Sequence, residues 1–228
     1  MKKFFCFALI LLIALSSAYT MDEAEKEEFS YAFGVLIGMD LLQMGMEFDY
    51  DAFIRGFRQA MEEEETGLTA DEAVEIIGAI MDARQAQIAD YNLSVGEAFL
   101  AENMERPEVT VTTSGLQYEV LSEGSGERPN IADSVLVHYT GTTIDGIVFD
   151  TTYEDGEPIE VPLFRVIPGW SEGLRLMREG ERARLYIPPD LAYGSYGAGG
   201  PIGPNAVLIF DVELLSVIPS QIIFDDGE

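Results

Sequence analysis

The chain has few of the side chains on which most enzyme chemistry depends. Its 228 residues include one cysteine, Cys6, and one histidine, His138. Cys6 lies inside an N-terminal leader, so the mature chain is expected to form no disulfide bond, use no thiol nucleophile and carry no lipid on a cysteine. The sequence shows neither a Ser-His-Asp set nor a histidine cluster for a metal. We therefore expect no covalent catalysis, no metal ion and no other cofactor.

Positive charge is also scarce. The chain has 13 lysine and arginine residues against 41 aspartate and glutamate residues, which gives a formal net charge of −28. A chain this acidic repels phosphate backbones, so no nucleic acid is expected as a partner. Carboxylates are calcium ligands, but the densest acidic run, residues 62–65, lacks the alternating spacing of a calcium loop. We interpret the acidity as a solvated surface, with calcium buffering as the less favoured alternative.

Long apolar runs are limited to the N-terminus. Residues 4–15 are apolar, follow Met1-Lys2-Lys3 and precede a group of small residues that ends near Ala18. This order is typical of a secretory signal peptide, and the run is shorter than the roughly 20 apolar residues of a membrane-spanning helix. We predict that residues 1–20 form a signal peptide. The mature chain would then be exported to the periplasm or the cell surface, without a membrane span.

Residues 21–106 carry apolar side chains at helical spacing. The pattern predicts one helix around residues 29–41 that stops at Gly45, and a second over residues 50–61. A third helix begins at Thr69, where Thr69 and Glu72 have the spacing of a capping box. A second possible capping box at residues 94–97 would break this helix at 92–94, so its continuity stays open.

Three helices of this length can bury only a modest core. Their apolar faces can pack on one another within one chain, or a second copy of the chain can cover them. Gly34 and Gly38, four residues apart, would allow another backbone to approach closely. We therefore predict that residues 21–106 form a helical homodimerisation domain with a connecting helix, and leave packing within one chain as the alternative.

After Pro107 the pattern changes to short β-type runs separated by turns that contain glycine. Strands are expected at residues 109–111, 116–121, 134–139, 147–150, 159–162, 182–187 and 207–215, with one short helix at 171–177. These elements predict an α+β domain over residues 107–218, in which an antiparallel sheet curls around one short helix. Residues 219–228 would form an acidic tail.

Five motifs of this half occur in an order and spacing that resemble the FKBP-type peptidyl-prolyl cis-trans isomerases. The resemblance covers residues 114–217 and rests on Val137-His138-Tyr139-Thr140-Gly141, Val148-Phe149-Asp150-Thr151-Thr152, Val166-Ile167-Pro168-Gly169-Trp170, Ile187-Pro188-Pro189-Asp190-Leu191-Ala192-Tyr193-Gly194 and Leu208-Ile209-Phe210-Asp211-Val212-Glu213-Leu214. The helical half, with Leu68-Thr69 and Gly96-Glu97-Ala98-Phe99-Leu100, resembles the secreted bacterial members of the macrophage infectivity potentiator type. Their helical domain is a dimerisation module.

The resemblance implies an enzyme that speeds rotation about X-Pro bonds. This rotation breaks amide resonance and has a barrier of about 18–20 kcal/mol. An apolar site that takes the amide out of water lowers the barrier, because water stabilises the planar, charge-separated form. The resemblance implies catalytic roles for Phe149, Asp150 and Tyr193. It implies a proline pocket with Trp170 as its floor, made of Tyr139, Phe149, Asp150, Val166, Ile167, Trp170, Ala192, Tyr193, Ile202 and Phe210.

Within this pocket the backbone amide of Ile167 and the hydroxyl of Tyr193 would donate hydrogen bonds to substrate carbonyls, with Asp150 beside the rotating carbonyl. Taken singly, residues such as Trp170 are typical of a protein core, and only the joint occurrence of the motifs favours a site. His138 alternates with Tyr139 along a strand and is expected to face the other side of the sheet. The implied partners are prolyl segments of unfolded exported proteins and the macrolide inhibitors of the family.

Three positions depart from the family pattern. Asp155 stands in the loop where an arginine commonly pairs with the aspartate, and a like charge tends to raise the pKa of a carboxylate. Arg165 and Arg184 are the candidates to replace that arginine. Ile159 stands where cytosolic relatives often have an aromatic residue, and Gly203 replaces a proline that is frequent in eukaryotic forms. Asp155 favours the alternative function, a non-catalytic prolyl-peptide binding module or holdase chaperone.

Overall fold

The structure, a computed structural model, describes residues 21–43, 45–154 and 156–220. The predicted signal peptide, most of the acidic tail and Asp155 lie outside the described residues. The chain divides into two compact units, Met1–Thr69 and Ala70–Glu228. The third helix therefore belongs to the same compact unit as the C-terminal sheet. No helix in the described ranges is both long and apolar enough to cross a membrane.

The described residues of the first unit, 21–43 and 45–69, contain two helices. Helix α1 (Glu23–Gln43) is followed by Gly45, whose φ of 59° is in the left-handed region that favours glycine after a helix. Helix α2 (Tyr50–Met61) begins and ends where the sequence pattern predicts. The carboxylate of Asp49 caps its N-terminus, because it accepts a hydrogen bond of 3.0 Å from the amide of Ala52.

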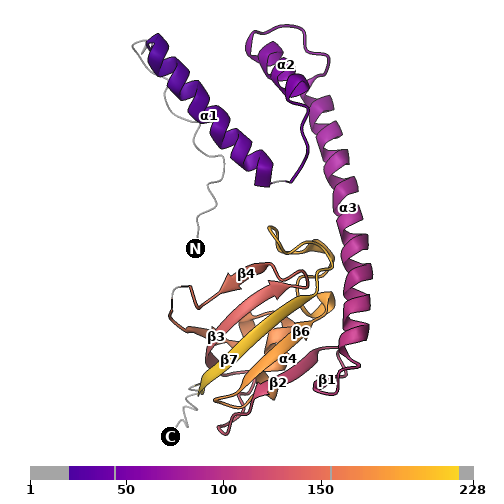
Figure 1. Ribbon diagram of the computed structural model, residues 1–228, viewed down its shortest axis with the longest axis vertical. Coiled ribbons are helices and arrows are strands. Elements are labelled where there is room, and N and C mark those ends of the chain that lie inside the picture. The colour runs from indigo at the N-terminus through magenta and orange to yellow at the C-terminus, as the bar shows by residue number, and fades with distance from the viewer. Residues whose placement is uncertain (1–20, 44, 155, 221–228) are drawn as a thin grey trace, which may run out of the picture. The chain divides into compact units, whose positions relative to one another are not determined.

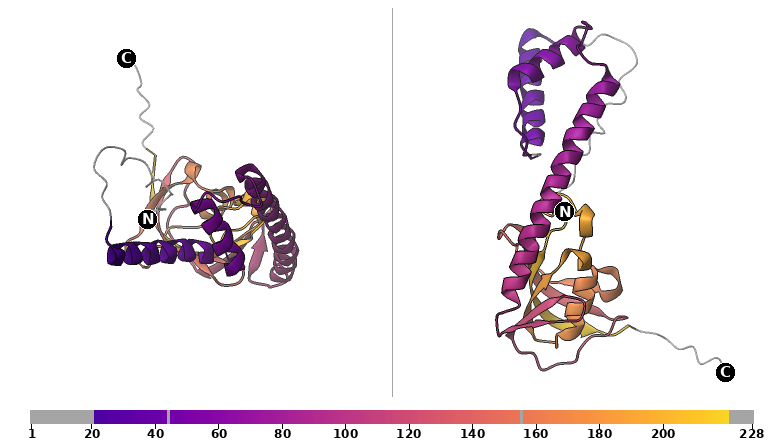
Figure 2. Two further views of the ribbon diagram at one scale, coloured as in Figure 1. Left: turned by 90° about the horizontal axis from the view of Figure 1, so that it is seen from above. Right: turned by 90° about the vertical axis from the view of Figure 1, so that its right-hand side faces the viewer.

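Helix α3 (Ala70–Asn103) has 34 residues. It runs without a break, as Figure 2 shows. The helix therefore does not break at residues 92–94, which answers the question that the sequence left open. Gly96 lies inside the helix and does not form part of a cap. It is buried, and a Cβ atom at this position would lie 2.8 Å from Cγ2 of Val207. The glycine thus lets α3 pack closely against the segment that leads into the last strand.

The second unit contains a seven-stranded antiparallel sheet (Figure 1). Its strands are β1 (Val109–Val111), β2 (Gln117–Ser122), β3 (Ser134–Thr143), β4 (Val148–Thr151), β5 (Ile159–Pro162), β6 (Arg182–Ile187) and β7 (Leu208–Ile218). They follow the order β1-β2-β6-β7-β3-β4, and β5 also pairs with β3. Strand β3 runs four residues beyond its predicted end, because pairing with β7 keeps residues 140–143 extended despite Gly141. The predicted α+β class is confirmed.

Helix α4 (Pro168–Leu176) covers one face of this sheet. It begins three residues earlier than predicted, since Pro168 is suited to the first helical position. Cβ atoms at Gly169 and Gly173 would lie 2.4 Å from Ile187 and 2.7 Å from Leu185, so the two glycines allow the helix to approach β6 closely. A core of fully buried side chains fills the space between sheet and helix, including Leu116, Val135, Val137, Leu163, Leu174, Met177, Leu185, Leu208 and Leu214.

The C-terminal part of α3 lies against the other face. Tyr186 points away from α4, because it alternates with Leu185 and Ile187 along β6, and its ring lies 5.9 Å from the ring of Phe99 in α3. Buried polar groups add to this contact: Asn103 donates to Gln117 at 2.7 Å, and Gln117 donates to the carbonyl of Leu100 at 2.8 Å. The helix end is thus fixed to β2 by satisfied polar groups, which would be costly to separate.

Candidate functional site

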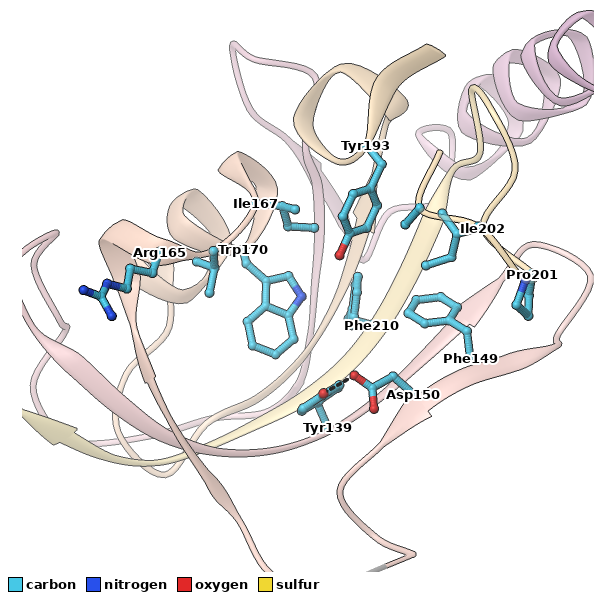
Figure 3. A pocket seen from close by; sticks show the side chains of 13 residues that line it. Tyr139, Phe149, Asp150, Arg165, Ile167, Trp170, Tyr193, Pro201, Ile202 and Phe210 are labelled. Atoms are coloured by element: carbon cyan, nitrogen blue, oxygen red, sulfur yellow. Dashed lines mark hydrogen bonds between the residues drawn. The ribbon is translucent and has the colours of Figure 1, made fainter. Parts of the chain in front are cut away.

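A cavity of about 510 Å³ opens between α4, the strands β3, β4 and β7, and the loop at residues 197–204 (Figure 3). It is lined by Tyr139, Phe149, Asp150, Arg165, Val166, Ile167, Trp170, Tyr193, Ala198, Gly199, Pro201, Ile202 and Phe210. The structure thus brings together every predicted pocket residue except Ala192. Ala192 does not line the cavity and packs against the hydrophobic core.

Aromatic rings form the floor and one wall of the cavity. Trp170, from the first turn of α4, is 5% exposed and meets the rings of Tyr139 and Phe210 edge-on at 4.9 and 5.1 Å between centroids. Phe149 meets Phe210 at 5.5 Å in the same way. A Cβ atom at Gly141 would lie 2.6 Å from Phe149 and 2.8 Å from Phe210. Glycine at this position therefore makes room for two aromatic rings over β3.

The acidic group of the cavity is held by a tyrosine. The hydroxyl of Tyr139 donates a short hydrogen bond to Asp150 Oδ2 across the β3–β4 pair (Figure 3). The backbone around Tyr139 is fixed by Thr152, whose Oγ1 accepts from the Tyr139 amide at 3.0 Å. Burial, and then the hydrogen bond to Asp150, raise the pKa of Tyr139 well above its ordinary value. The phenol is therefore a stable donor, and the carboxylate is oriented before any ligand enters.

Two hydrogen-bond donors face the space above the floor. Within the described residues, Trp170 Nε1 is the one buried side-chain nitrogen or oxygen without a hydrogen-bond partner. The hydroxyl of Tyr193 points into the cavity from the opposite side (Figure 3). An unpaired buried donor costs free energy, and an acceptor on a bound ligand would remove that cost. The site is thus suited to an apolar group that carries a carbonyl.

Neither Arg165 nor Arg184, the two candidates to replace the usual arginine, pairs with Asp150. Arg184 donates to both carboxylate oxygens of Asp211, with 2.7 Å between Nη2 and Oδ2. Arg165 borders the cavity but extends away from it and lies 5.5 Å from the ring of Phe164 (Figure 3). Among the described residues, no ion pair reaches Asp150. Asp155, the residue expected at the position of that arginine, is outside the described part of the chain.

His138 lies outside the cavity, as the strand alternation predicts. Its ring stacks on Tyr153 at 4.8 Å, and its Nδ1 is 2.9 Å from Thr152 Oγ1. It cannot reach a ligand in the cavity and has no place in the chemistry of the site. In the described ranges, no three His, Cys, Asp or Glu side chains converge as a metal site.

Four lining residues were not among the predicted pocket residues: Arg165, Ala198, Gly199 and Pro201. The last three belong to the loop that also carries Ile202. The amide of Ala198 donates to the carbonyl of Ile202 at 2.9 Å, which folds the loop back on itself. The Gly-Gly-Pro sequence before Ile202 indicated a turn but not its direction.

Comparison with protein families agrees with this geometry. A model described as FKBP-type peptidyl-prolyl cis-trans isomerase matches residues 125–215, and one described as the domain amino terminal to FKBP-type peptidyl-prolyl isomerase matches residues 26–120. The chain belongs to the FKBP-type peptidyl-prolyl cis-trans isomerases. The resemblance inferred from the five motifs is thereby confirmed, and so is the assignment of the chain to this class of enzyme.

Relatives of this FKBP-type chain match most of its length. It is 37% identical over 229 residues to the outer membrane protein MIP of Legionella longbeachae, which covers 95% of this chain and 98% of the relative. It is 42% identical over 201 residues to a probable FKBP-type isomerase, FkpA, of Neisseria meningitidis, covering 84% and 74%. The crystal structure of FkpA from Escherichia coli superposes with a TM-score of 0.65 at 35% identity, covering 87% of this chain and 98% of that one.

The raised pKa of Tyr139 predicts a specific loss of stability in alkali. The unfolded chain releases this proton near its ordinary pKa of about 10, whereas the folded chain keeps it. The free energy of unfolding therefore falls as the pH rises above about 10. Tyr153 and Tyr186, whose pKa values burial also raises, act in the same direction. In Tyr139→Phe the fall should be less steep than in the wild type.

Urea unfolding at several pH values between about 9 and 11 measures this slope. Tyr196→Phe is the matched control, because Tyr196 is 89% exposed, and it should keep the wild-type slope. Identical slopes for all three proteins would contradict the assigned burial and pairing of Tyr139.

Proposed function

We propose that this FKBP-type chain is an exported folding catalyst that twists X-Pro amides in the aromatic cavity without covalent chemistry. The observation that supports this most is the floor of the cavity, where four aromatic rings surround a site with one unpaired indole donor. A prolyl ring in contact with Trp170 would place its amide in an environment poor in water. Loss of water destabilises the planar, polar amide more than the twisted one.

Three polar groups would add selectivity for the twisted state. The backbone amide of Ile167, at the start of α4, and the hydroxyl of Tyr193 would hold carbonyls of the peptide on either side of the bond. Asp150 would lie beside the rotating carbonyl. In the planar amide this oxygen carries extra negative charge, so the carboxylate repels it more strongly than in the twisted amide, where resonance is lost. Each contact thus favours rotation without a bond being made or broken.

Export is supported by two observations. The predicted signal peptide has the cationic start, apolar middle and small-residue end of a secretory leader. A relative that aligns with 95% of the chain is named an outer membrane protein. The substrates we propose are prolyl segments of unfolded proteins in the periplasm or at the cell surface, and the family's macrolide inhibitors would compete for the same cavity.

Removal of one wall of the cavity tests the catalytic proposal. Phe149→Ala should lower kcat/KM for an Ala-Leu-Pro-Phe peptide at least about ten-fold, because the lost ring corresponds to more than about 1.4 kcal/mol of transition-state binding. Asp150→Leu should also lower it strongly. A protease-coupled isomerisation assay measures both. Phe164→Ala is the matched control, since Phe164 is 62% exposed and does not line the cavity, and it should keep wild-type activity.

Wild-type protein that binds the peptide without any acceleration over the uncatalysed rate would contradict this function. Suppression of aggregation that persists in Phe149→Ala would then favour the binding module or holdase. Asp155→Arg, assayed in parallel, shows whether the reversed charge in this loop reduces activity.

We also propose that the helical half forms a homodimer. Large apolar side chains are exposed along both helices of the first unit and along the N-terminal part of α3: Phe29, Leu36, Met39, Leu42, Ile54, Phe57, Met61, Val74, Ile77 and Ile80. Apolar surface on this scale is typical of an interface. A second copy of the same chain can cover it with the same residues.

Light scattering on the mature chain at micromolar concentration should give the mass of a dimer. Ile77→Glu should shift the mass toward the monomer, because a charge in an apolar interface lacks a partner. Ile131→Glu, which also alters an exposed isoleucine but in the sheet domain, should leave the dimer intact. A wild-type mass of one chain would refute the proposal.

A further inference from the structure

The loop at residues 197–204 forms one wall of the cavity and is also attached to the long helix. It contributes Pro201 and Ile202 to the cavity lining, and Ile202 is 8% exposed. Gly197, Gly199 and Gly200 have φ values of 67°, 83° and 54°. Glycine backbones in this region are conformationally permissive, so the loop sequence alone does not fix the position of Ile202.

Two hydrogen bonds join the end of this loop to α3. The side-chain amide of Asn92 donates to the carbonyl of Pro204 at 2.8 Å, and the side-chain amide of Asn205 donates to the carbonyl of Ala89 at 3.2 Å. Pro204 is fully buried. Pro204 is two residues after Ile202 in the sequence. The hydrogen bond to its carbonyl therefore fixes the backbone close to Ile202.

The packing at this contact is tight. A Cβ atom on Gly203 would lie 3.1 Å from Asn92 Nδ2 and 3.2 Å from Cγ2 of Ile88, so the loop backbone lies directly on the helix. The backbone amide of Asn205 donates to the carbonyl of Gly194 at 2.8 Å. This bond connects the end of the loop to the segment that carries Tyr193. One helix contact therefore reaches two elements of the cavity wall.

We propose that Asn92 of α3 is a positioning residue for the prolyl cavity: its amide holds the Pro204 carbonyl and thereby keeps the wall formed by Ile202 in the conformation that binds substrate. The residue touches no substrate itself. The expected change in KM rests on the proposed isomerase function. The contact between Asn92 and the cavity wall does not depend on it. Both Asn92 and the loop belong to one compact unit, so the coupling acts within that unit.

Loss of the Asn92 amide should let the loop visit conformations in which the wall is displaced. The apparent affinity for substrate then falls in proportion to the fraction of molecules with the wall in place, while bound substrate still rotates at a similar rate. Because one hydrogen bond is worth a few-fold to ten-fold in an equilibrium, KM should rise by up to about ten-fold with little change in kcat.

Full-length mature protein with Asn92→Ala and, separately, Asn92→Asp tests this. Aspartate keeps the shape of the side chain but has no amide to donate, and it provides the second variant if Asn92→Ala folds poorly. Gln87→Ala is the matched control, because it removes a side-chain amide from an exposed position of the same helix. Steady-state isomerisation of the Ala-Leu-Pro-Phe peptide gives KM and kcat for each protein.

The ¹³C-labelled Cδ1 methyl resonance of Ile202, assigned by Ile202→Val, reports the wall without substrate. It should shift or broaden in both Asn92 variants and stay unchanged in Gln87→Ala. An unchanged methyl resonance and KM in folded Asn92 variants would overturn the proposal and leave Asn92 as a structural anchor. If the wild type shows no catalysis, the proposed function fails, and the methyl resonance alone still decides whether Asn92 positions the wall.

Discussion

The cavity depends on the close packing of helix α4 on the sheet. Gly169 and Gly173 bring the helix onto β6 at a distance that a Cβ atom would prevent. Trp170, next to the first of these glycines, is thereby held against the rings of Tyr139 and Phe210. Gly141 makes the corresponding room on β3. If a side chain at any of these three glycines prevented the close packing, the aromatic rings could not meet edge-on. The floor of the site would then open to water.

One face of the sheet forms the cavity, and the other binds the end of α3. The face under α4 carries an apolar cavity whose carboxylate, Asp150, is already held by Tyr139. The opposite face carries polar groups that fix the end of α3, such as the buried pair of Asn103 and Gln117. The loop at residues 197–204 joins the two, since it lines the cavity and is bound by Asn92 of α3. A preorganised, largely neutral floor suits a reaction that needs a change of environment and no chemical step.

Much of this arrangement was predictable, because each motif is local in sequence and its spacing specifies where strands and turns fall. All seven strands and the short helix were expected from these patterns, and nine cavity residues were expected from the resemblance to the FKBP-type family. Contacts between distant segments were not. The ion pair of Arg184 with Asp211 follows from the register of β6 and β7. Continuity of α3 follows from the contact of Gly96 with Val207, whereas the local sequence resembled a cap. Ala192 and Tyr193 are adjacent, but only Tyr193 lines the cavity. The direction of the backbone decides which of the two does so, and the sequence did not indicate it.

In the proposed function, the aromatic cavity speeds X-Pro rotation by removing water and by polar contacts to the peptide, without proton transfer or covalent chemistry. The most direct measurement is NMR exchange spectroscopy on a prolyl peptide, with and without the mature protein, in H₂O and in D₂O. Cross-peaks between the cis and trans forms should appear well within the tens to hundreds of seconds of the uncatalysed reaction. The exchange rate should be the same in both solvents, because no proton is transferred. Exchange no faster than without protein, or a clearly slower rate in D₂O, would contradict the proposed mechanism.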